Sequence, residues 1–136
     1  MTIYYRDGMK YQTARDYMRR TPICPPDDII TKWWTLTKRG VLLLKDGFAW
    51  DGASGPTFDT KNSMSPSAEH DALCKMLRNR SLDYDLWQDR INEFFRERCE
   101  ENGMAPWRAS LWHAGVEFGD AGNPKQGADD KILEAP

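Results

Sequence analysis

The hydrophobic residues of this 136-residue chain change their spacing once, about half-way along. Before residue 60 they form short runs of β-branched and aromatic residues separated by Gly, Pro and Asp, which is typical of strands and tight turns. After residue 65 they recur at intervals of three and four, the spacing of amphipathic helices. A chain that separates strands from helices in this way packs a sheet against a helical layer. We therefore predict a small α+β fold, in which an N-terminal antiparallel β-meander and hairpins pack against about three C-terminal helices.

Turn residues divide the N-terminal half into short strands. Asp7-Gly8 predicts a hairpin between strands at 3–6 and 9–13, because both central positions of a type I′ turn need positive φ. Residues 14–28 contain three prolines, which lack an amide donor and hold the preceding residue extended, so we expect a covering loop there. The following strands are expected to form a three-strand meander: Ile29–Thr37, Val41–Lys45 and Phe48–Trp50.

The C-terminal half carries helix start and stop signals. Ser65-Pro66 predicts a helix start with the hydroxyl as cap, and the apolar spacing continues to about Asn79. Asp83 is expected to cap a second helix that ends near Asn102. A third helix is expected to begin at Pro106, with apolar residues on two of its sides.

Composition and charge exclude several classes of function. With 19 basic and 21 acidic residues the net charge is −2, and the longest basic run is Arg19-Arg20, so we expect no nucleic-acid partner. No apolar run is long enough for a membrane span or an export signal, so neither is expected. The cysteines at 24, 74 and 99 are odd in number, and we expect reduced thiols in the cytosol. A change in composition predicts one α+β domain over 1–119 and an extended C-terminal tail over 120–136.

A Gly-rich turn that bears a carboxylate precedes the only His-Asp pair in the chain. The turn occupies residues 47–56 and reads Gly-Phe-Ala-Trp-Asp-Gly-Ala-Ser-Gly-Pro, and His70-Asp71-Ala72-Leu73 follows it. Together with Val116-x-x-Gly119, this pattern resembles the phage and prophage proteins catalogued as protein of unknown function 1353. The resemblance covers roughly residues 41–119 and implies a small α+β domain of phage or prophage origin. The chain departs from the family pattern at Cys74, where an aromatic residue is usual.

Three side chains of this region form the candidate catalytic and metal-binding site: Asp51, His70 and Asp71. Imidazole nitrogen and carboxylate oxygen are ligands of catalytic divalent metals, and such a site would hydrolyse a phosphoester or an amide. His113 on the third helix is a further ligand candidate. The alternative is structural: Asp51 accepts backbone amides of its turn, and His70 donates to it or to a carbonyl. Both hypotheses require Asp51 and His70 to meet.

Two other residues carry weaker hypotheses. Ser54 is a candidate nucleophile with His70 as its base and a neighbouring aspartate as orienting group. Its surroundings are not the Gly-x-Ser-x-Gly elbow, so a role in the turn is the simpler interpretation. Asp89 lies opposite the apolar stripe of its helix and is expected to be solvated.

Six tryptophans indicate either a large aromatic core or a docking surface. Trp33 and Trp34 are adjacent, so on a strand they point to opposite faces and one is expected to be exposed. Trp107 and Trp112 lie on the two-sided third helix. Because aromatic residues are enriched in interface cores, these four side chains predict a protein partner or self-association.

Three functions from different classes follow from these patterns. The first is a phage-encoded, metal-assisted hydrolase with a divalent metal at Asp51, His70 and Asp71. The second is a virion or tail-associated structural or assembly protein, in which this cluster is a structural staple and the tryptophans and C-terminal tail bind neighbouring subunits. The third is an effector that binds a host protein. All three place the protein in the cytoplasm of an infected bacterium, and the second also places it in the virion.

Overall fold

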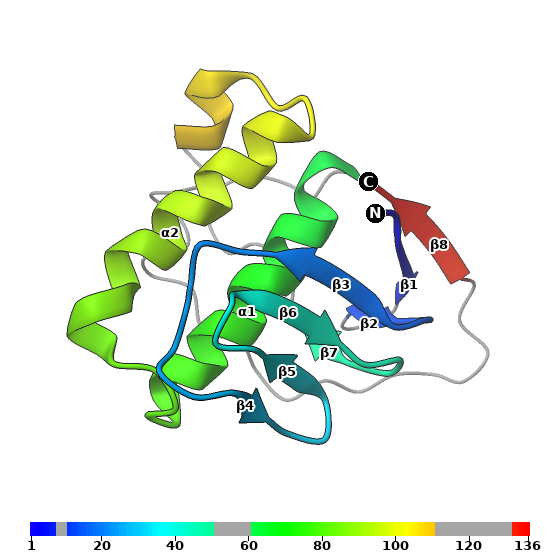
Figure 1. Ribbon diagram of the computed structural model, residues 1–136. Helices are drawn as coiled ribbons and strands as arrows, with labels where there is room; N and C mark the ends of the chain where they lie inside the picture. Colours follow the sequence, from blue (N-terminus) through cyan, green and yellow to red (C-terminus); the bar gives the residue numbers. More distant parts are fainter. Residues whose placement is uncertain (8–10, 51–60, 111–131) are drawn as a thin grey trace.

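The computed structural model describes residues 1–7, 11–50, 61–110 and 132–136. Within these residues, strands form two antiparallel sheets, two long helices follow seven of the strands, and the chain is helical again at 106–110 (Figure 1). This confirms the predicted α+β fold. The strands are β1 (Ile3–Asp7), β2 (Tyr11–Thr13), β3 (Tyr17–Arg20), β4 (Ile29–Ile30), β5 (Trp34–Leu36), β6 (Val41–Leu44), β7 (Ala49–Trp50) and β8 (Ile132–Ala135). The helices are the 3-10 helix η1 (Lys61–Ser63), α1 (Met64–Arg78) and α2 (Tyr84–Glu101).

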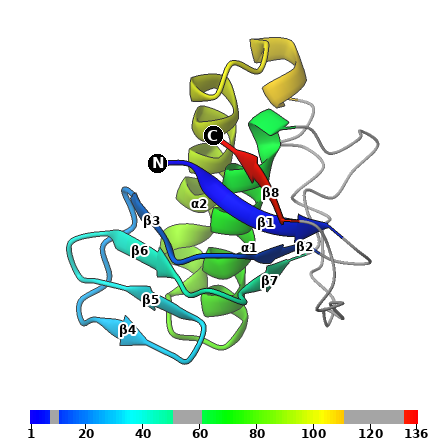
Figure 2. The same cartoon turned by 90° about the vertical axis from the view of Figure 1, so that its right-hand side faces the viewer.

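The two sheets share one core with α1 and part of α2. Their strand orders are β7-β2-β1-β8 and β3-β6-β5-β4. In Figure 1, α1 runs behind the strands and α2 lies alongside it, and Figure 2 shows the same layers from the side. Phe48 and Trp50 stack in this core, and the Trp50 indole N–H donates to the Ser67 hydroxyl of α1 at 2.9 Å. The buried tryptophan therefore ties the first sheet to the helical layer.

The N-terminal hairpin is confirmed, but its turn differs from the predicted one. β1 pairs with β2 so that Tyr5 lies opposite Thr13 and Asp7 lies opposite Tyr11. A two-residue turn at Asp7-Gly8 would instead place residue 6 opposite residue 9. Asp7 therefore belongs to β1, and residues 8–10, which separate the strands, lie outside the described residues.

The predicted covering loop over 14–28 is wrong in its first part, because Tyr17–Arg20 forms β3. This strand pairs with β6, and its side chains alternate: Tyr17 is 1% exposed and Met18 is 50% exposed. The proline-containing residues 21–26 are not helical, as predicted. A tyrosine, a methionine and two arginines have little apolar alternation of their own, so the burial of Tyr17 by α1 and α2 decides that this segment is a strand.

The predicted three-strand meander is wrong in two places. Its first strand is divided into β4 and β5, because the Thr31 hydroxyl closes a turn by donating to the Trp34 carbonyl at 2.8 Å and accepting its N–H at 3.0 Å. Its last strand, β7, pairs with β2 in the other sheet. Buried Thr13 directs this change, because its hydroxyl donates to the Lys45 carbonyl at 2.7 Å and accepts the Phe48 N–H at 2.9 Å.

The second long helix follows the prediction at both ends. The Asp83 carboxylate accepts the Leu86 N–H at 3.1 Å, which satisfies one of the free amides of the first turn. The helix ends at Glu101, two residues before Gly103, whose φ of 96° suits a residue without a side chain. Local capping chemistry therefore sets the limits of α2.

The first long helix begins at Met64, before the predicted start, and Ser65 is not its cap. The Ser65 hydroxyl donates instead to the Pro136 carbonyl at 2.6 Å. That contact is possible because β8 (Ile132–Ala135) pairs with β1 at an edge of the first sheet, with Ile3 opposite Ala135, and Pro136 follows directly. No helix in the described residues is both long enough and apolar enough to cross a membrane.

Candidate functional site

His70 and Asp71 lie in the second turn of α1 and point to different neighbours. The His70 ring faces α2, where its Nε2 is 2.7 Å from the Asn92 Oδ1 and its centroid is 5.3 Å from that of Phe95. The Asp71 carboxylate instead accepts a hydrogen bond from the Lys75 ammonium at 2.9 Å. Consecutive residues of a helix differ by about 100° in direction, which accounts for this divergence.

No metal-ligand cluster is found in the described part of the chain, where no three His, Cys, Asp or Glu side chains gather. Asp51, Ser54, Trp112 and His113 lie outside the described residues. The contact between Asp51 and His70, on which both site hypotheses depend, therefore stays a prediction. The metal site and the Ser54 nucleophile stay predictions for the same reason.

Cys74 lies one helical turn after His70, with its Sγ 3.5 Å from Nε2 and 3.6 Å from Nδ1 of the ring. Since an amide oxygen can only accept, the Nε2 nitrogen of His70 donates to Asn92. Burial, with a smaller contribution from the Asp71 charge, raises the pKa of the Cys74 thiol to about 12. Such a thiol stays protonated at neutral pH and is a poor nucleophile. We interpret these side chains as a polar link between α1 and α2.

The most deeply buried ion pair of the described residues is absent from the predicted sites. Glu69 of α1 and Arg98 of α2 are 1% and 2% exposed, and Arg98 Nε is 3.1 Å from Glu69 Oε1. The Tyr17 hydroxyl of β3 donates to Glu69 Oε2 at 2.6 Å, and Arg19 Nε lies 3.7 Å from the same oxygen. The Arg98 guanidinium also donates to the Ser65 hydroxyl at 3.1 Å. This cluster joins β3, α1 and α2.

The electrostatics of the cluster are those of a closed structural network. Burial raises the pKa of Glu69, and the positive charge of Arg98 is the main influence that opposes this rise. Burial, together with the Glu69 charge, also raises the pKa of Tyr17 to about 12, so its hydroxyl remains a neutral donor. Both carboxylate oxygens have donors, and the pair is shielded from solvent. We interpret this network as a connection between the layers.

A sequence signal for this network exists. Arg98 falls within the apolar stripe of α2, seven residues after Ile91 and next to Cys99, both of which are fully buried. Glu69 lies beside the buried Ala68 and among core-facing positions of α1. Opposite charges at core-facing positions of two consecutive helices predict a buried ion pair, because an unpaired buried charge is too costly.

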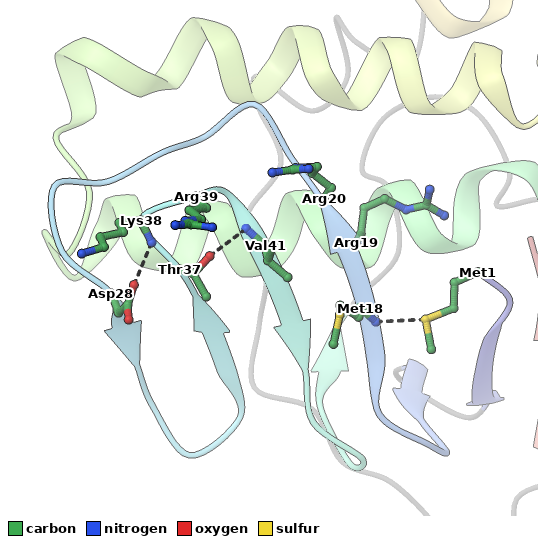
Figure 3. Close-up of a pocket in the computed structure, with 9 residues that line it drawn as sticks. All are labelled: Met1, Met18, Arg19, Arg20, Asp28, Thr37, Lys38, Arg39 and Val41. Atoms are coloured by element: carbon green, nitrogen blue, oxygen red, sulfur yellow. Dashed lines mark hydrogen bonds between the residues drawn. The ribbon is translucent and has the colours of Figure 1, made fainter.

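A basic groove lies on the second sheet, with a volume of about 720 Å³. Figure 3 shows it extending from the N-terminus and β3 to the turn between β5 and β6. Three apolar, four cationic, one hydroxyl and one acidic side chain form its lining: Met1, Met18 and Val41; Arg19, Arg20, Lys38 and Arg39; Thr37; and Asp28. The Asp28 carboxylate already accepts the backbone N–H of Lys38 at 2.8 Å. The lining therefore favours an anionic group flanked by apolar ones.

A row of three apolar side chains and one threonine crosses the solvent-facing side of the same sheet. Met18, Leu43, Thr35 and Ile30 lie opposite one another on successive strands, and we call these four residues the outer row. Met18 is 50% exposed and Ile30 is 75% exposed. The solvent face of an antiparallel sheet normally carries polar side chains, whereas three of these four residues are apolar.

The adjacent tryptophans divide as predicted. Trp33 is 40% exposed, with the Lys32 ammonium 4.9 Å from its ring, whereas Trp34 is partly buried and meets the Phe48 ring edge-on at 6.0 Å. Trp107, in the helical residues 106–110, is 72% exposed. Asp89 is exposed on α2, also as predicted. Two of the predicted interface tryptophans are thus available to a partner.

Comparison of the chain with protein-family models, with curated proteins and with solved structures finds no match. The resemblance to the phage family therefore stays a prediction.

Proposed function

We propose that this chain is a phage-encoded structural or assembly protein that binds a protein partner through the outer row of its second sheet. The observation that carries the proposal is the exposure of Met18 and Ile30 on the solvent side of an antiparallel sheet. Burying such side chains stabilises a complex by about 25 cal/mol per Å² of apolar surface removed from water. The phage origin rests on the resemblance of residues 47–56 and 70–73.

The described contacts of the predicted catalytic pair support this function over hydrolysis. His70 bonds to Asn92 across the helix interface, and Asp71 pairs with Lys75. The first contact joins α1 to α2, and the second lies within α1. The deepest polar cluster, around Glu69 and Arg98, connects layers in the same way. These contacts fit a rigid scaffold that presents a binding surface.

Site-specific photo-cross-linking tests the proposal. A benzophenone amino acid is placed at Ile30 or, separately, at Trp33, both exposed on the second-sheet side of the molecule. The matched control places it at Asp89, which is also exposed but lies on α2, away from the outer row. In host cells producing the phage, we expect one discrete cross-linked protein from Ile30 and Trp33 and none from Asp89.

The opposite pattern would refute the proposal. The hydrolase would be favoured if Ile30 and Trp33 gave no cross-links and if His70→Gln or Asp71→Asn abolished phage production. These variants would have to unfold at the same temperature as the wild type. Discrete cross-linking from Asp89 alone would move the binding surface to α2.

A further inference from the structure

We infer that the free edge of β3 receives an extended, acidic segment of the partner protein as an added strand. This inference rests on the proposed function, because it names how the partner is held and what its binding segment is made of. It combines three observations: the position of β3 at the end of its sheet, the direction of its backbone groups, and the charges of the basic groove.

The register of β3 shows which of its backbone groups face outward. The N–H of Thr21 donates to the Gly40 carbonyl at 2.7 Å, so residues 21 and 40 form a hydrogen-bonded pair. Hydrogen-bonded and non-bonded pairs alternate along an antiparallel ladder. Arg19 and Tyr17 therefore bond to β6, whereas the N–H and C=O groups of Met18 and Arg20 point away from it, toward the free edge.

Only a weak contact occupies this edge at Met18. Its N–H donates to the Met1 Sδ at 3.3 Å, and a thioether sulfur is a weak acceptor. The Met1 side chain is 64% exposed and sits at the mouth of the groove (Figure 3). An incoming carbonyl would replace the sulfur with a stronger acceptor while the long methionine side chain moves aside.

The charges of the groove select an acidic segment. Arg20, Lys38 and Arg39 line the groove, and the only carboxylate among its lining residues, Asp28, is already bonded to the backbone of the turn. Acidic side chains of a strand added to β3 would lie beside Arg20, and apolar ones beside Met18, while Lys38 and Arg39 extend the positive charge of the groove across β6 (Figure 3). A second copy of β3 is disfavoured at the same edge, because antiparallel self-pairing would set arginines against arginines.

The test uses a synthetic peptide of about ten residues with alternating glutamate and valine, a length that matches an ordinary strand. Binding to the full chain is followed by fluorescence anisotropy, and hydrogen exchange is measured at the Met18 and Arg20 amides. The decisive control is the same peptide with alternate backbone amides N-methylated, which keeps every side chain but removes one hydrogen-bonding edge. We expect the methylated peptide to bind roughly tenfold more weakly or worse, as two lost hydrogen bonds would require.

Charge reversal gives a second readout. Arg20→Glu in the groove is expected to weaken peptide binding, whereas the matched control Arg90→Glu, on the exposed side of α2, is expected to leave it unchanged. An oligothymidylate of similar length serves as a polyanion without strand-forming backbone, and we expect no protection of the Met18 and Arg20 amides when it is added.

The outcomes separate this inference from the proposed function. Strand addition would be overturned if the methylated peptide bound as tightly as the unmethylated one, or if the peptide left amide exchange at Met18 and Arg20 unchanged. It would also be overturned if the oligonucleotide bound more tightly than the peptide. If cross-linking from Ile30 persists in any of these cases, the assembly function stands and only the mode of binding is wrong. If cross-linking from Ile30 is also absent, both proposals fail.

Discussion

Replacing Arg98 with methionine removes the main partner of the buried Glu69 carboxylate. Methionine keeps much of the side-chain volume but cannot make the hydrogen bonds of the guanidinium. These bonds are 3.1 Å and 3.3 Å to the two Glu69 oxygens, 3.1 Å to the Ser65 hydroxyl and 3.2 Å to the Asn102 Oδ1. Both charged side chains are almost fully buried, so water does not replace the lost partner. Breaking a buried pair from one side costs about 3–5 kcal/mol, and we expect Arg98→Met to lower the free energy of unfolding by that amount.

The same substitution on the surface provides the control. Arg96 lies two residues earlier on α2 and pairs with Glu93 and Glu100, but it is 30% exposed. We expect Arg96→Met to lower the free energy of unfolding by less than about 1 kcal/mol, because exposed ion pairs contribute little. Urea denaturation of both variants at pH 7 measures the difference.

The pH dependence identifies the cause of the loss. Arg98 is the largest influence that holds down the pKa of Glu69 against the effect of burial, so this pKa rises further in Arg98→Met. When the pKa of a carboxyl group is higher in the folded protein than in the unfolded chain, the group contributes its full stability below the unfolded-state pKa. This contribution to the free energy of unfolding is lost as pH rises through the folded-state pKa. The difference in free energy of unfolding between Arg98→Met and the wild type should therefore become smaller as pH falls from 7 toward 4. Adding Glu69→Gln to Arg98→Met should restore part of the lost stability at pH 7. The reasoning would be refuted if the difference in free energy of unfolding did not change with pH. It would also be refuted if the losses of the two single variants simply added in the double variant.

Three further changes test the structure elsewhere. The buried indole N–H of Trp34 has no hydrogen-bond partner among the described residues, whereas that of Trp50 donates to a serine hydroxyl at 2.9 Å. In chemical denaturation, Trp50→Phe should therefore be at least about 1 kcal/mol more destabilising than Trp34→Phe. Burial raises the pKa of Tyr17 from 10.0 to about 12, so the phenol ionises at a lower pH in the unfolded chain than in the folded one. The free energy of unfolding should therefore fall by about 3 kcal/mol or less between pH 10 and 12. Urea denaturation across this pH range should show no such loss for Tyr17→Phe. Asp83→Ala removes the cap of α2 and should cost about 1 kcal/mol in thermal melts, whereas Asp89→Ala on the exposed side of α2 should cost almost nothing.

The helical layer could be predicted because its signals are local. Asp83 caps α2 through an amide three residues away, and Gly103 lies just beyond its end. The exposure of Asp89 follows from helical phase alone. One of the adjacent tryptophans is exposed as predicted, although Trp33 lies in the turn before β5 and not on a strand.

The candidate sites could be predicted only in part. The outer row and the basic groove depend on a register that brings Met18 opposite Leu43 and places β3 beside the turn at 37–39. Neither arrangement can be read from β3 itself, whose four residues resemble a loop. Arg98 does lie in an apolar stripe, but its partner is 29 residues away in sequence and on another helix.

The amino-acid sequence by itself determined that strands precede helices in this chain and where α2 begins and ends, because those features depend on residues close together in the sequence. The strand at Tyr17–Arg20 was not among them, because the burial of Tyr17 decides it. Tertiary structure decided which strands pair. Thr13 moves β7 to the first sheet through bonds to residues more than thirty positions away, and β8 reaches β1 from the other end of the chain. Long-range hydrogen bonds and burial carry that information, and they exist only once the core has formed.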